Sequence, residues 1–303
     1  MTPGYFKQRS RRASPAALLL GSIALFSLLL AACSSGDSTT PGNNSTSTAI
    51  TPPANLITSG VLTVGSDTTY PPQEFIDPTT HKAVGFDVDL ITEIAKLMGL
   101  QVKIVSTPFT TIIDDLAAKH FDVVISAVNI IPDRQEKADF IPYLKAGESL
   151  LVQKGNPKHI TSADNLCGLA VGVQQGTVEQ GVLQSSSDNC LEQEKPEIKI
   201  TALEDQTAVV QLLTTNKVVA TYQDSPVTDY YVKQNSSQLE AAGTVFGEDT
   251  EGIAVRKGDT AMLQAIQAAF KQVKTAGTYH QLIIKWGIAN SELALIDRRR
   301  NAA

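Results

Sequence analysis

The same alternation of strand and helix patterns runs twice along this chain, and this repetition constrains the fold more than any other feature. In the first half, strands are expected at residues 60–65, 101–105 and 121–126, with helices at 86–98 and 110–119. In the second half, strands are expected at 168–174, 197–203 and 218–223, with helices at 176–184 and 204–215. A β–α–β–α–β order predicts parallel strands joined by helical crossovers. The sequence therefore predicts an α/β fold with two lobes, each a mostly parallel sheet flanked by helices.

Two further strand-like stretches, at residues 148–154 and 252–256, stand between the repeated units. Two chain crossings between lobes form a hinge, which is the arrangement that closes domains around a ligand. The predicted organisation is listed in chain order: residues 55–148 in lobe 1, 149–250 in lobe 2, 251–290 back in lobe 1, and 291–303 as a tail. Residues 260–288 read as two amphipathic helices separated at Gly277.

The stretch 121–134, FDVVISAVNIIPDR, carries the first candidate binding group. Its buried strand runs out into small or polar residues, namely Ser126, Ala127 and Asn129. Pro132 then opens a short helix that carries Arg134. Open α/β sheets bind ligands beyond the carboxyl ends of their strands, and the arginine fork holds a carboxylate bidentately. Arg134 is the candidate anchor, and the alternative is a solvated arginine on a charged helical turn.

The first 33 residues form a targeting segment, because basic residues precede an apolar run at 16–30 that is short for a membrane span. This run ends in Leu-Ala-Ala-Cys, which resembles a bacterial lipobox and would place a lipid on Cys33. The alternative is a plain secretory signal with a chance cysteine. Residues 34–54 are rich in Ser, Thr, Gly, Asn and Pro and predict a flexible tether. We therefore expect an extracytoplasmic protein anchored to the cell membrane.

The remaining cysteines, Cys167 and Cys190, flank one strand–helix unit and are expected to form a structural disulfide in an exported protein. A reactive thiol is the alternative, and it would need a histidine nearby to lower its pKa. The four histidines are isolated in the sequence, so no metal site, cofactor or nucleophilic triad is predicted. The formal net charge is −6 with no basic run inside the folded region, which argues against nucleic acid as a partner.

Taken together, residues 55–288 resemble the family 3 extracellular solute-binding proteins, the polar amino-acid receptors of ATP-binding-cassette importers. Six stretches carry the resemblance: GVLTVGSDTTYPPQEF (60–75), VGFDVDL (84–90), FDVVISAVNIIPDR (121–134), VGVQQGT (171–177), DSPV (224–227) and AGTYHQLIIKWG (276–287). Each stretch is a weak signal alone, but together, at these spacings, they are specific. The resemblance implies a two-lobe periplasmic-binding-protein type II fold.

The resemblance also assigns roles to residues that contact the backbone of an amino acid. It matches Arg134 to the group that grips the α-carboxylate. Thr177 and Val178, which follow Gly176, match the start of the second-lobe helix, whose N–H groups also suit a carboxylate. Asp224 matches the acid that takes the α-ammonium group.

The remaining matched residues concern further contacts and the ligand side chain. Ser126 and Asn129 match polar strand-end positions, with Ala127 between them. Tyr70 and Phe109 match aromatic residues that pack on either side of the ligand side chain, and Asp67 matches a position that reads that side chain. An aspartate there favours a cationic or amide side chain. The structural alternatives are a lobe-core role for Tyr70 and a local backbone cap for Asp67.

The chain departs from the family pattern at Gln73, where an aromatic is usual, and at Asn129 and Ile131, where Ser or Thr is common. These departures leave arginine, lysine, ornithine, histidine and glutamine open as the ligand. Asp87 and Asp89 are interpreted as helix-start residues, with Asp87 as the N-cap.

The leading hypothesis is a monomeric, lipid-anchored receptor that closes its lobes on a free amino acid and delivers it to a membrane permease. One alternative is an enzyme, because the same fold resembles periplasmic dehydratases that act on cyclohexadienyl acids such as prephenate or arogenate. A second alternative is the sensor domain of a receptor, which would need a separate signalling partner.

Overall fold

The computed structural model describes residues 50–293 of the 303-residue chain. The predicted signal segment, the lipobox with Cys33, most of the tether and most of the tail lie outside the described residues. Between residues 50 and 293, no helix is long and apolar enough to cross a membrane.

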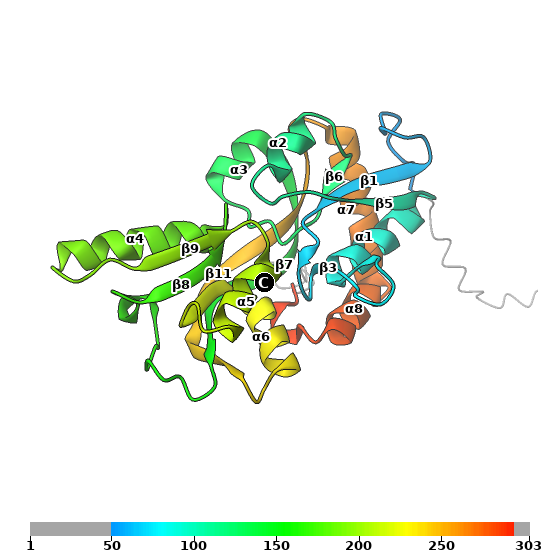
Figure 1. Cartoon of the computed structure of the whole chain (residues 1–303). Coiled ribbons are helices and arrows are strands. Elements are labelled where there is room, and N and C mark those ends of the chain that lie inside the picture. Colours follow the sequence, from blue (N-terminus) through cyan, green and yellow to red (C-terminus); the bar gives the residue numbers. More distant parts are fainter. Residues whose placement is uncertain (1–49, 294–303) are drawn as a thin grey trace, which may run out of the picture. The chain divides into compact units, whose positions relative to one another are not determined.

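A single eight-stranded sheet runs through the described chain in the order β5-β1-β6-β11-β7-β10-β8-β9 (Figure 1). The strands are β1 (Val61–Ser66), β5 (Gln101–Ser106), β6 (Val123–Val124), β7 (Ala138–Gln153), β8 (Ala170–Gln174), β9 (Lys199–Leu203), β10 (Ala220–Asp224) and β11 (Leu239–Arg256). Strands β5, β1 and β6 are parallel to one another, as are β10, β8 and β9, which matches the two predicted repeats. The two parallel groups are joined into one mixed sheet because β7 and β11 pair antiparallel between them.

We call the side that contains β5, β1 and β6 lobe 1 and the side that contains β10, β8 and β9 lobe 2. Both long strands pass from one lobe into the other and pair from Arg256 opposite Ala138 to Leu239 opposite Gln153. The stretches predicted as crossings, 148–154 and 252–256, are parts of these longer strands. Register shifts interrupt the pairing between Ala242 and Gly252, which is where the ribbon passes between the lobes.

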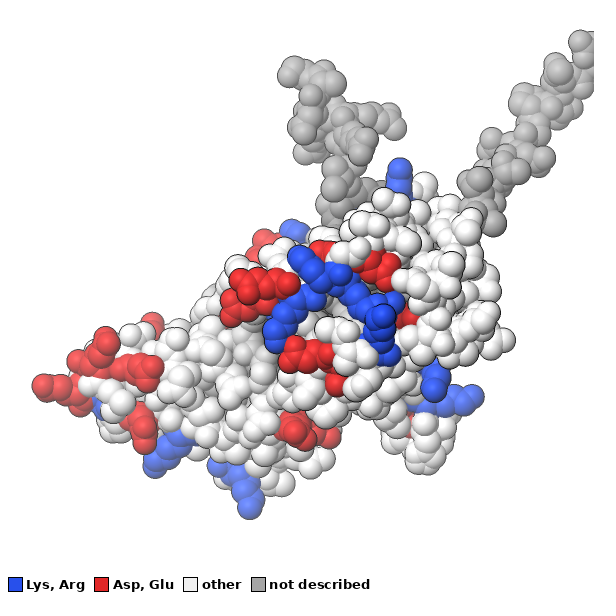
Figure 2. Space-filling view, turned by 90° about the horizontal axis from the view of Figure 1, so that it is seen from above, with Lys and Arg blue, Asp and Glu red and all other residues white. Residues whose placement is uncertain are grey.

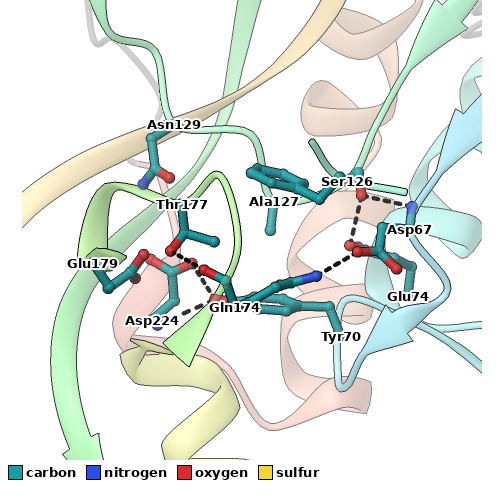
Figure 3. Close-up of a pocket in the computed structure, with 11 residues that line it drawn as sticks. Asp67, Tyr70, Glu74, Ser126, Ala127, Asn129, Gln174, Thr177, Glu179 and Asp224 are labelled. Atoms are coloured by element: carbon teal, nitrogen blue, oxygen red, sulfur yellow. Dashed lines mark hydrogen bonds between the residues drawn. The ribbon is translucent and has the colours of Figure 1, made fainter. Parts of the chain in front are cut away.

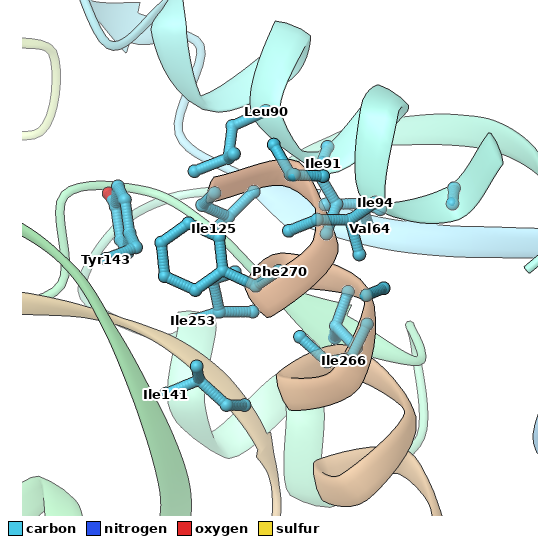
Figure 4. Close-up of a cluster of buried hydrophobic side chains, with 14 of the residues drawn as sticks. Val64, Leu90, Ile91, Ile94, Ile125, Ile141, Tyr143, Ile253, Ile266 and Phe270 are labelled. Carbon is cyan, nitrogen blue, oxygen red and sulfur yellow. The ribbon is translucent and has the colours of Figure 1, made fainter. Parts of the chain in front are cut away.

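Lobe 1 owes its stability to a large apolar core between the sheet and three helices (Figure 4). The helices are α1 (Phe86–Leu97), α7 (Thr260–Thr275) and α8 (Thr278–Trp286). Apolar residues at helical spacing, such as Leu90, Ile91 and Ile94, face Val64 of β1 and Phe270 of α7. The predicted break at Gly277 is confirmed, since this residue adopts a left-handed conformation (φ 78°) between α7 and α8.

Lobe 1 contains five further short elements. They are the small sheet of β2 (Thr69–Tyr70), β3 (Glu74–Ile76) and β4 (Ala83–Val84), and the short helices α2 (Ile112–Ala117) and α3 (Pro132–Lys137). Pro132 occupies the first turn of α3 as predicted, where its missing N–H costs no hydrogen bond. Strand β6 is shorter than the predicted strand 121–126, because the chain turns at Ala127 (φ 46°) to deliver polar groups to the cleft.

Lobe 2 has a smaller core, between its sheet and the helices α4 (Val178–Glu192), α5 (Gln206–Thr214) and α6 (Ser225–Gln234). Its main cluster contains 12 buried residues, compared with 25 in the main cluster of lobe 1. A disulfide joins Cys167 to Cys190, with an S–S distance of 2.01 Å. The predicted disulfide is confirmed, and it ties the end of α4 to the segment that precedes β8.

The prediction that Asp87 caps α1 is wrong. Gly85 is the N-cap, and Asp87 is fully buried in the first turn of the helix. Gly85 is required there, since its φ is 137° and a Cβ atom would lie 2.0 Å from the carbonyl oxygen of Gln73. This close approach brings the β2–β3 hairpin, and with it Glu74, against the start of α1.

Candidate functional site

A small cavity lies between the lobes, where the carboxyl ends of the parallel strands of both lobes meet (Figure 3). Residues from both lobes line it: Asp67, Tyr70, Glu74, Phe109, Ser126, Ala127, Asn129, Gln174, Thr177, Glu179 and Asp224. Four of the lining side chains are carboxylic acids, and none of the described lining residues is a lysine, arginine or histidine. The cavity is therefore suited to a ligand with positive charge.

The lobe 1 end of the cavity is built by the residues that follow β1 and β6. The Ser126 hydroxyl donates to Glu74 Oε1 at 2.9 Å and accepts from the Asp67 backbone N–H at 2.8 Å. These bonds hold two carboxyl groups, Asp67 and Glu74, at one end of the cavity. Burial raises the pKa of Asp67 to about 6, although hydrogen bonds from Thr69 and Gln174 lower it.

Behind Glu74, a buried polar network continues into the lobe 1 core. Asp87 Oδ2 accepts the backbone N–H of Ala127 at 3.1 Å, and the Tyr143 hydroxyl lies 2.6 Å from the same oxygen. That hydroxyl also lies 3.0 Å from Glu251 Oε2, on strand β11. Burial raises the pKa of Glu74 and of Glu251 well above the ordinary value, and the neighbouring acids of the network act in the same direction.

The lobe 2 end of the cavity is built by the end of β10 and the start of α4. Asp224 accepts the Tyr70 hydroxyl at 2.8 Å, and burial raises the pKa of this acid to about 7. Thr177 is the N-cap of α4 and accepts the backbone N–H of Gln180 at 3.2 Å. Glu179, in the first turn of the same helix, is only 1% exposed. Burial and the neighbouring Asp224 raise its pKa well above the ordinary value.

The two lobes contact each other directly across the cavity. The Gln174 side chain donates to Asp67, and the backbone N–H of Gln206 donates to Thr69 Oγ1 at 3.2 Å. The bond between Tyr70 and Asp224 also joins lobe 1 to lobe 2. The arrangement is thus a closed one, in which lobe 1 and lobe 2 residues share the same cavity.

The guanidinium of Arg134 lies beside the cavity, at the boundary between the lobes. It donates to the backbone carbonyls of Asn129 and Gly176, each at 3.0 Å, and its Cζ lies 5.1 Å from the centre of the Phe109 ring. A groove beside the cavity is lined by residues that include Phe109, Arg134 and Gly176. The role predicted for Arg134, holding a ligand carboxylate, stays a prediction, and the observed contacts make it a bridge between the lobes.

Comparison with known proteins identifies the family. Residues 62–289, about three quarters of the chain, match the model of the bacterial extracellular solute-binding proteins, family 3. The chain belongs to this family.

Curated relatives of this solute-binding protein are named for amino-acid ligands. It is 32% identical over 228 residues to the L-cystine-binding protein TcyJ of Escherichia coli, a match that spans 75% of this chain and 82% of the relative. It is 30% identical to the histidine-binding periplasmic protein of E. coli, across 74% of this chain and 86% of the relative.

Solved structures of similar proteins share the fold. An ancestral arginine-binding protein bound to arginine has 35% identity and a TM-score of 0.69, covering 75% of this chain and 98% of that chain. The ancestral amino acid-binding protein AncCDT-1, described as a precursor of cyclohexadienyl dehydratase, has 34% identity and a TM-score of 0.68, covering 75% and 95%. These named relatives and neighbours are binding proteins, and the type II two-lobe fold predicted from the sequence is confirmed.

Most residues predicted for the site of this solute-binding protein line the cavity. The structure brings together Asp67, Tyr70, Phe109, Ser126, Ala127, Asn129, Thr177 and Asp224. It does not place Arg134, Gly176 or Val178 in the cavity wall, although Gly176 contacts Arg134 beside it.

Three lining residues were missed by the sequence reasoning: Glu74, Gln174 and Glu179. Gln174 lies inside the quoted VGVQQGT motif, and Glu74 follows the departure at Gln73. Glu179 had a detectable signal, because it lies four residues before the buried Leu183 and eight before the buried Ser187.

Proposed function

We propose that this solute-binding protein is an extracytoplasmic receptor that binds a free amino acid with a cationic side chain between its lobes. The acidic cavity wall carries this proposal. Asp67 and Glu74 stand at the lobe 1 end, and Asp224 and Glu179 at the lobe 2 end. An amino acid with one ammonium group and a second positive group places one cation against each pair of acids. Arginine, lysine and ornithine have this chemistry, whereas glutamine and uncharged histidine have only one cation.

The aromatic residues Tyr70 and Phe109 support the same ligand class. Both line the cavity, and a cation is attracted to the face of an aromatic ring. The names of the relatives, which cite arginine, histidine and cystine, also support an amino-acid ligand.

The surface supports a small-molecule ligand over a nucleic acid. In the face shown by Figure 2, basic and acidic side chains are interleaved, and acidic ones gather where α4 and β9 lie in Figure 1. Together with a net charge of −6, this face offers no continuous basic surface for a phosphate backbone.

A thermal-shift screen tests the proposed ligand. The protein, starting after Cys33, is unfolded and refolded to remove bound ligand, and then heated with arginine, lysine, ornithine, histidine, glutamine, cystine and prephenate. A ligand that binds at about 1 μM and is added at about 1 mM stabilises the protein by about 4 kcal/mol. This corresponds to an increase in Tm on the order of 10 °C.

The largest shift is expected with one of the three dicationic amino acids. A response to glutamine or cystine alone would contradict the cationic ligand, and turnover of prephenate would replace the receptor by the dehydratase hypothesis. If none of the amino acids raises the Tm, the proposed function is overturned.

We further propose that a lipid on Cys33 anchors the receptor to the cell membrane and that an ABC importer accepts the released ligand. The support is the lipobox pattern before the tether and the family to which the chain belongs. Detergent-phase partitioning of the full chain expressed in a bacterium is the test. The native chain should enter the detergent phase, and the Cys33→Ala chain should stay in the aqueous phase; partitioning of both chains alike would contradict the anchor.

A further inference from the structure

Glu179 is a buried acid that neither the family resemblance nor the sequence motifs assign. It comes from the first turn of α4, is 1% exposed, and lines the cavity. Its Oε1 atom has no hydrogen-bond partner. A carboxylate is favoured at a helix N-terminus, but no group of the helix donates a hydrogen bond to this oxygen.

Glu74 Oε2, at the opposite end of the cavity, lacks a hydrogen-bond partner. Two other buried polar atoms, at the Glu179 end, also lack one. They are Asp224 Oδ1, at the end of β10, and Asn129 Nδ2, in the loop between β6 and α3. Figure 3 shows the Glu179 and Asp224 side chains next to each other, with Asn129 above them. The Asn129 amide lies near enough to lower the pKa of Asp224, but it makes no hydrogen bond of normal geometry.

Three unpartnered buried atoms on separate elements are unusual, because buried polar atoms are almost always hydrogen-bonded. Two of the three are acceptors on acids and one is an amide donor. A ligand ammonium can donate to both acids, while a carboxylate on the same carbon can accept from the amide. The three atoms are therefore complementary to the backbone of an α-amino acid.

Acids, tyrosines and one arginine surround the pair. Glu148 of β7 and Asp249 of β11 add negative charge near Asp224, and burial acts in the same direction. The tyrosine hydroxyls of Tyr70 and Tyr222 are neutral at pH 7, because burial raises the pKa of both groups. Arg134 is the nearby cation; its guanidinium donates to two carbonyl oxygens and also attracts both acids of the pair. Two adjacent buried carboxyl groups repel each other when both are ionised, and this repulsion favours a proton held between them.

We propose that Glu179 is a specificity-determining residue that forms, with Asp224, a two-carboxyl seat for the ligand ammonium, and that the ammonium displaces the proton shared by the two acids. The displaced proton passes to the solvent buffer. The inference rests on the proposed function, namely that a free amino acid binds in this cavity. It requires a free ammonium on the ligand, and it makes affinity increase with pH until the pair is ionised without ligand.

Isothermal titration calorimetry tests the seat, first on the wild-type protein. The probes are L-arginine, L-lysine and L-ornithine, together with the Nα-acetyl derivative of whichever binds. Titrations in buffers of different ionisation enthalpy should show release of about one proton at pH 7. The dissociation constant should rise by up to about tenfold for each pH unit of acidification below pH 7. The Nα-acetyl derivative should bind at least about 100-fold more weakly.

The test variant is Glu179→Gln, which keeps the shape of the side chain and removes its charge. It should weaken binding by about 10- to 100-fold at pH 8 and reduce the proton release to less than half. The matched control is Glu192→Gln, the same change at an exposed position at the other end of α4, which should leave both quantities unchanged.

Binding of the Glu179→Gln protein within about twofold of wild type, with the same proton release, would overturn the seat and leave the proposed function standing. If that variant fails to fold, wild-type binding without proton release, or with tolerance of the acetyl group, overturns the seat equally. If none of the three amino acids binds the wild-type protein, the proposed cationic ligand fails, and the inference fails with it.

Discussion

The two lobes hold their halves of the cavity in different ways. In lobe 1, the acids at the cavity are connected through Asp87, Tyr143 and Glu251 to the largest apolar core of the molecule. In lobe 2, Glu179 and Asp224 stand at the end of a helix and of a strand, each with an unpartnered oxygen. Glu74 Oε2 and Asn129 Nδ2 of lobe 1 also lack partners. Both halves thus leave polar atoms for a ligand to satisfy, and they differ in the buried polar network that connects the lobe 1 acids to the core.

The two lobes also differ in what stabilises them. A large core supports buried polar groups in lobe 1, since the apolar burial around them offsets their desolvation. The smaller core of lobe 2 is supplemented by the disulfide between Cys167 and Cys190. We therefore expect substitutions in the buried polar network to destabilise lobe 1 most. Loss of the disulfide should destabilise lobe 2 most.

The largest effect is expected from Asp87→Ala in lobe 1. This change removes two buried hydrogen bonds to a carboxylate, from the Ala127 N–H and the Tyr143 hydroxyl, each worth about 2 kcal/mol, for a loss of about 4 kcal/mol of unfolding free energy. The lobe 2 counterpart is Asp205→Ala, which removes the N-cap of α5 and costs about 1 kcal/mol. Urea unfolding of the ligand-free proteins measures both. Equal losses would break the proposed difference between the lobes.

Loss of the disulfide should come next. The double variant Cys167→Ser, Cys190→Ser is expected to lose about 3 kcal/mol, because the unfolded chain gains freedom. Hydrogen exchange should show the loss of protection in β8, β9 and α4 before it reaches β1 and α1. A uniform loss over both lobes would show that they unfold as one unit.

Ligand binding should depend strongly on Asp224. Asp224→Asn is expected to weaken binding of a basic amino acid by about 100-fold, or about 2.7 kcal/mol, since a charged partner is lost in a buried site. Ser126→Ala, which removes one neutral hydroxyl at the opposite end, should cost only about 1 kcal/mol. Calorimetric titration of both variants provides the measurement, and a reversed order would contradict the proposed position of the ammonium.

The stability of the ligand-free protein should decrease as the pH rises from 5 to 8. Asp67 and Asp87 each have a pKa raised from 3.8 to about 6 in the folded state, and Asp224 to about 7. The folded state therefore holds extra protons, and this contribution is complete below pH 4 and is lost as the pH passes through 6 and 7. The three shifts together correspond to a loss of several kcal/mol. Thermal unfolding measures it, and a stability that rises over this range would show that the acids are ionised in the fold.

The sequence predicted the helices and strands well where an apolar pattern meets a core. Helix α1 was expected at 86–98 and is found at Phe86–Leu97, because Leu90, Ile91 and Ile94 face the sheet at helical spacing. The same pattern could have corrected the assignment of Asp87. It lies three, four and seven residues before these apolar positions, on the buried side of the helix. Its type, an acid at a helix start, suggests a cap, whereas its position on the helix determines its burial.

The cavity was harder to predict, because its acids are buried against the usual preference of charged groups for water. Glu74 has no apolar periodicity around it to show that it faces inward. The direction of the Arg134 side chain depends on carbonyl oxygens of Asn129 and Gly176, which come together only when the two lobes are placed. Local sequence carries no information on such a contact.

Gln153 pairs with Leu239 at the lobe 2 ends of β7 and β11. The chain enters and leaves the segment 154–238 at neighbouring points. That segment is a cassette with its two ends side by side, so it could be exchanged for that of a relative without stretching the rest of the chain. A chimera of this kind would carry the lobe 1 acids of one receptor and the lobe 2 acids of another, and its ligand preference would report each contribution separately.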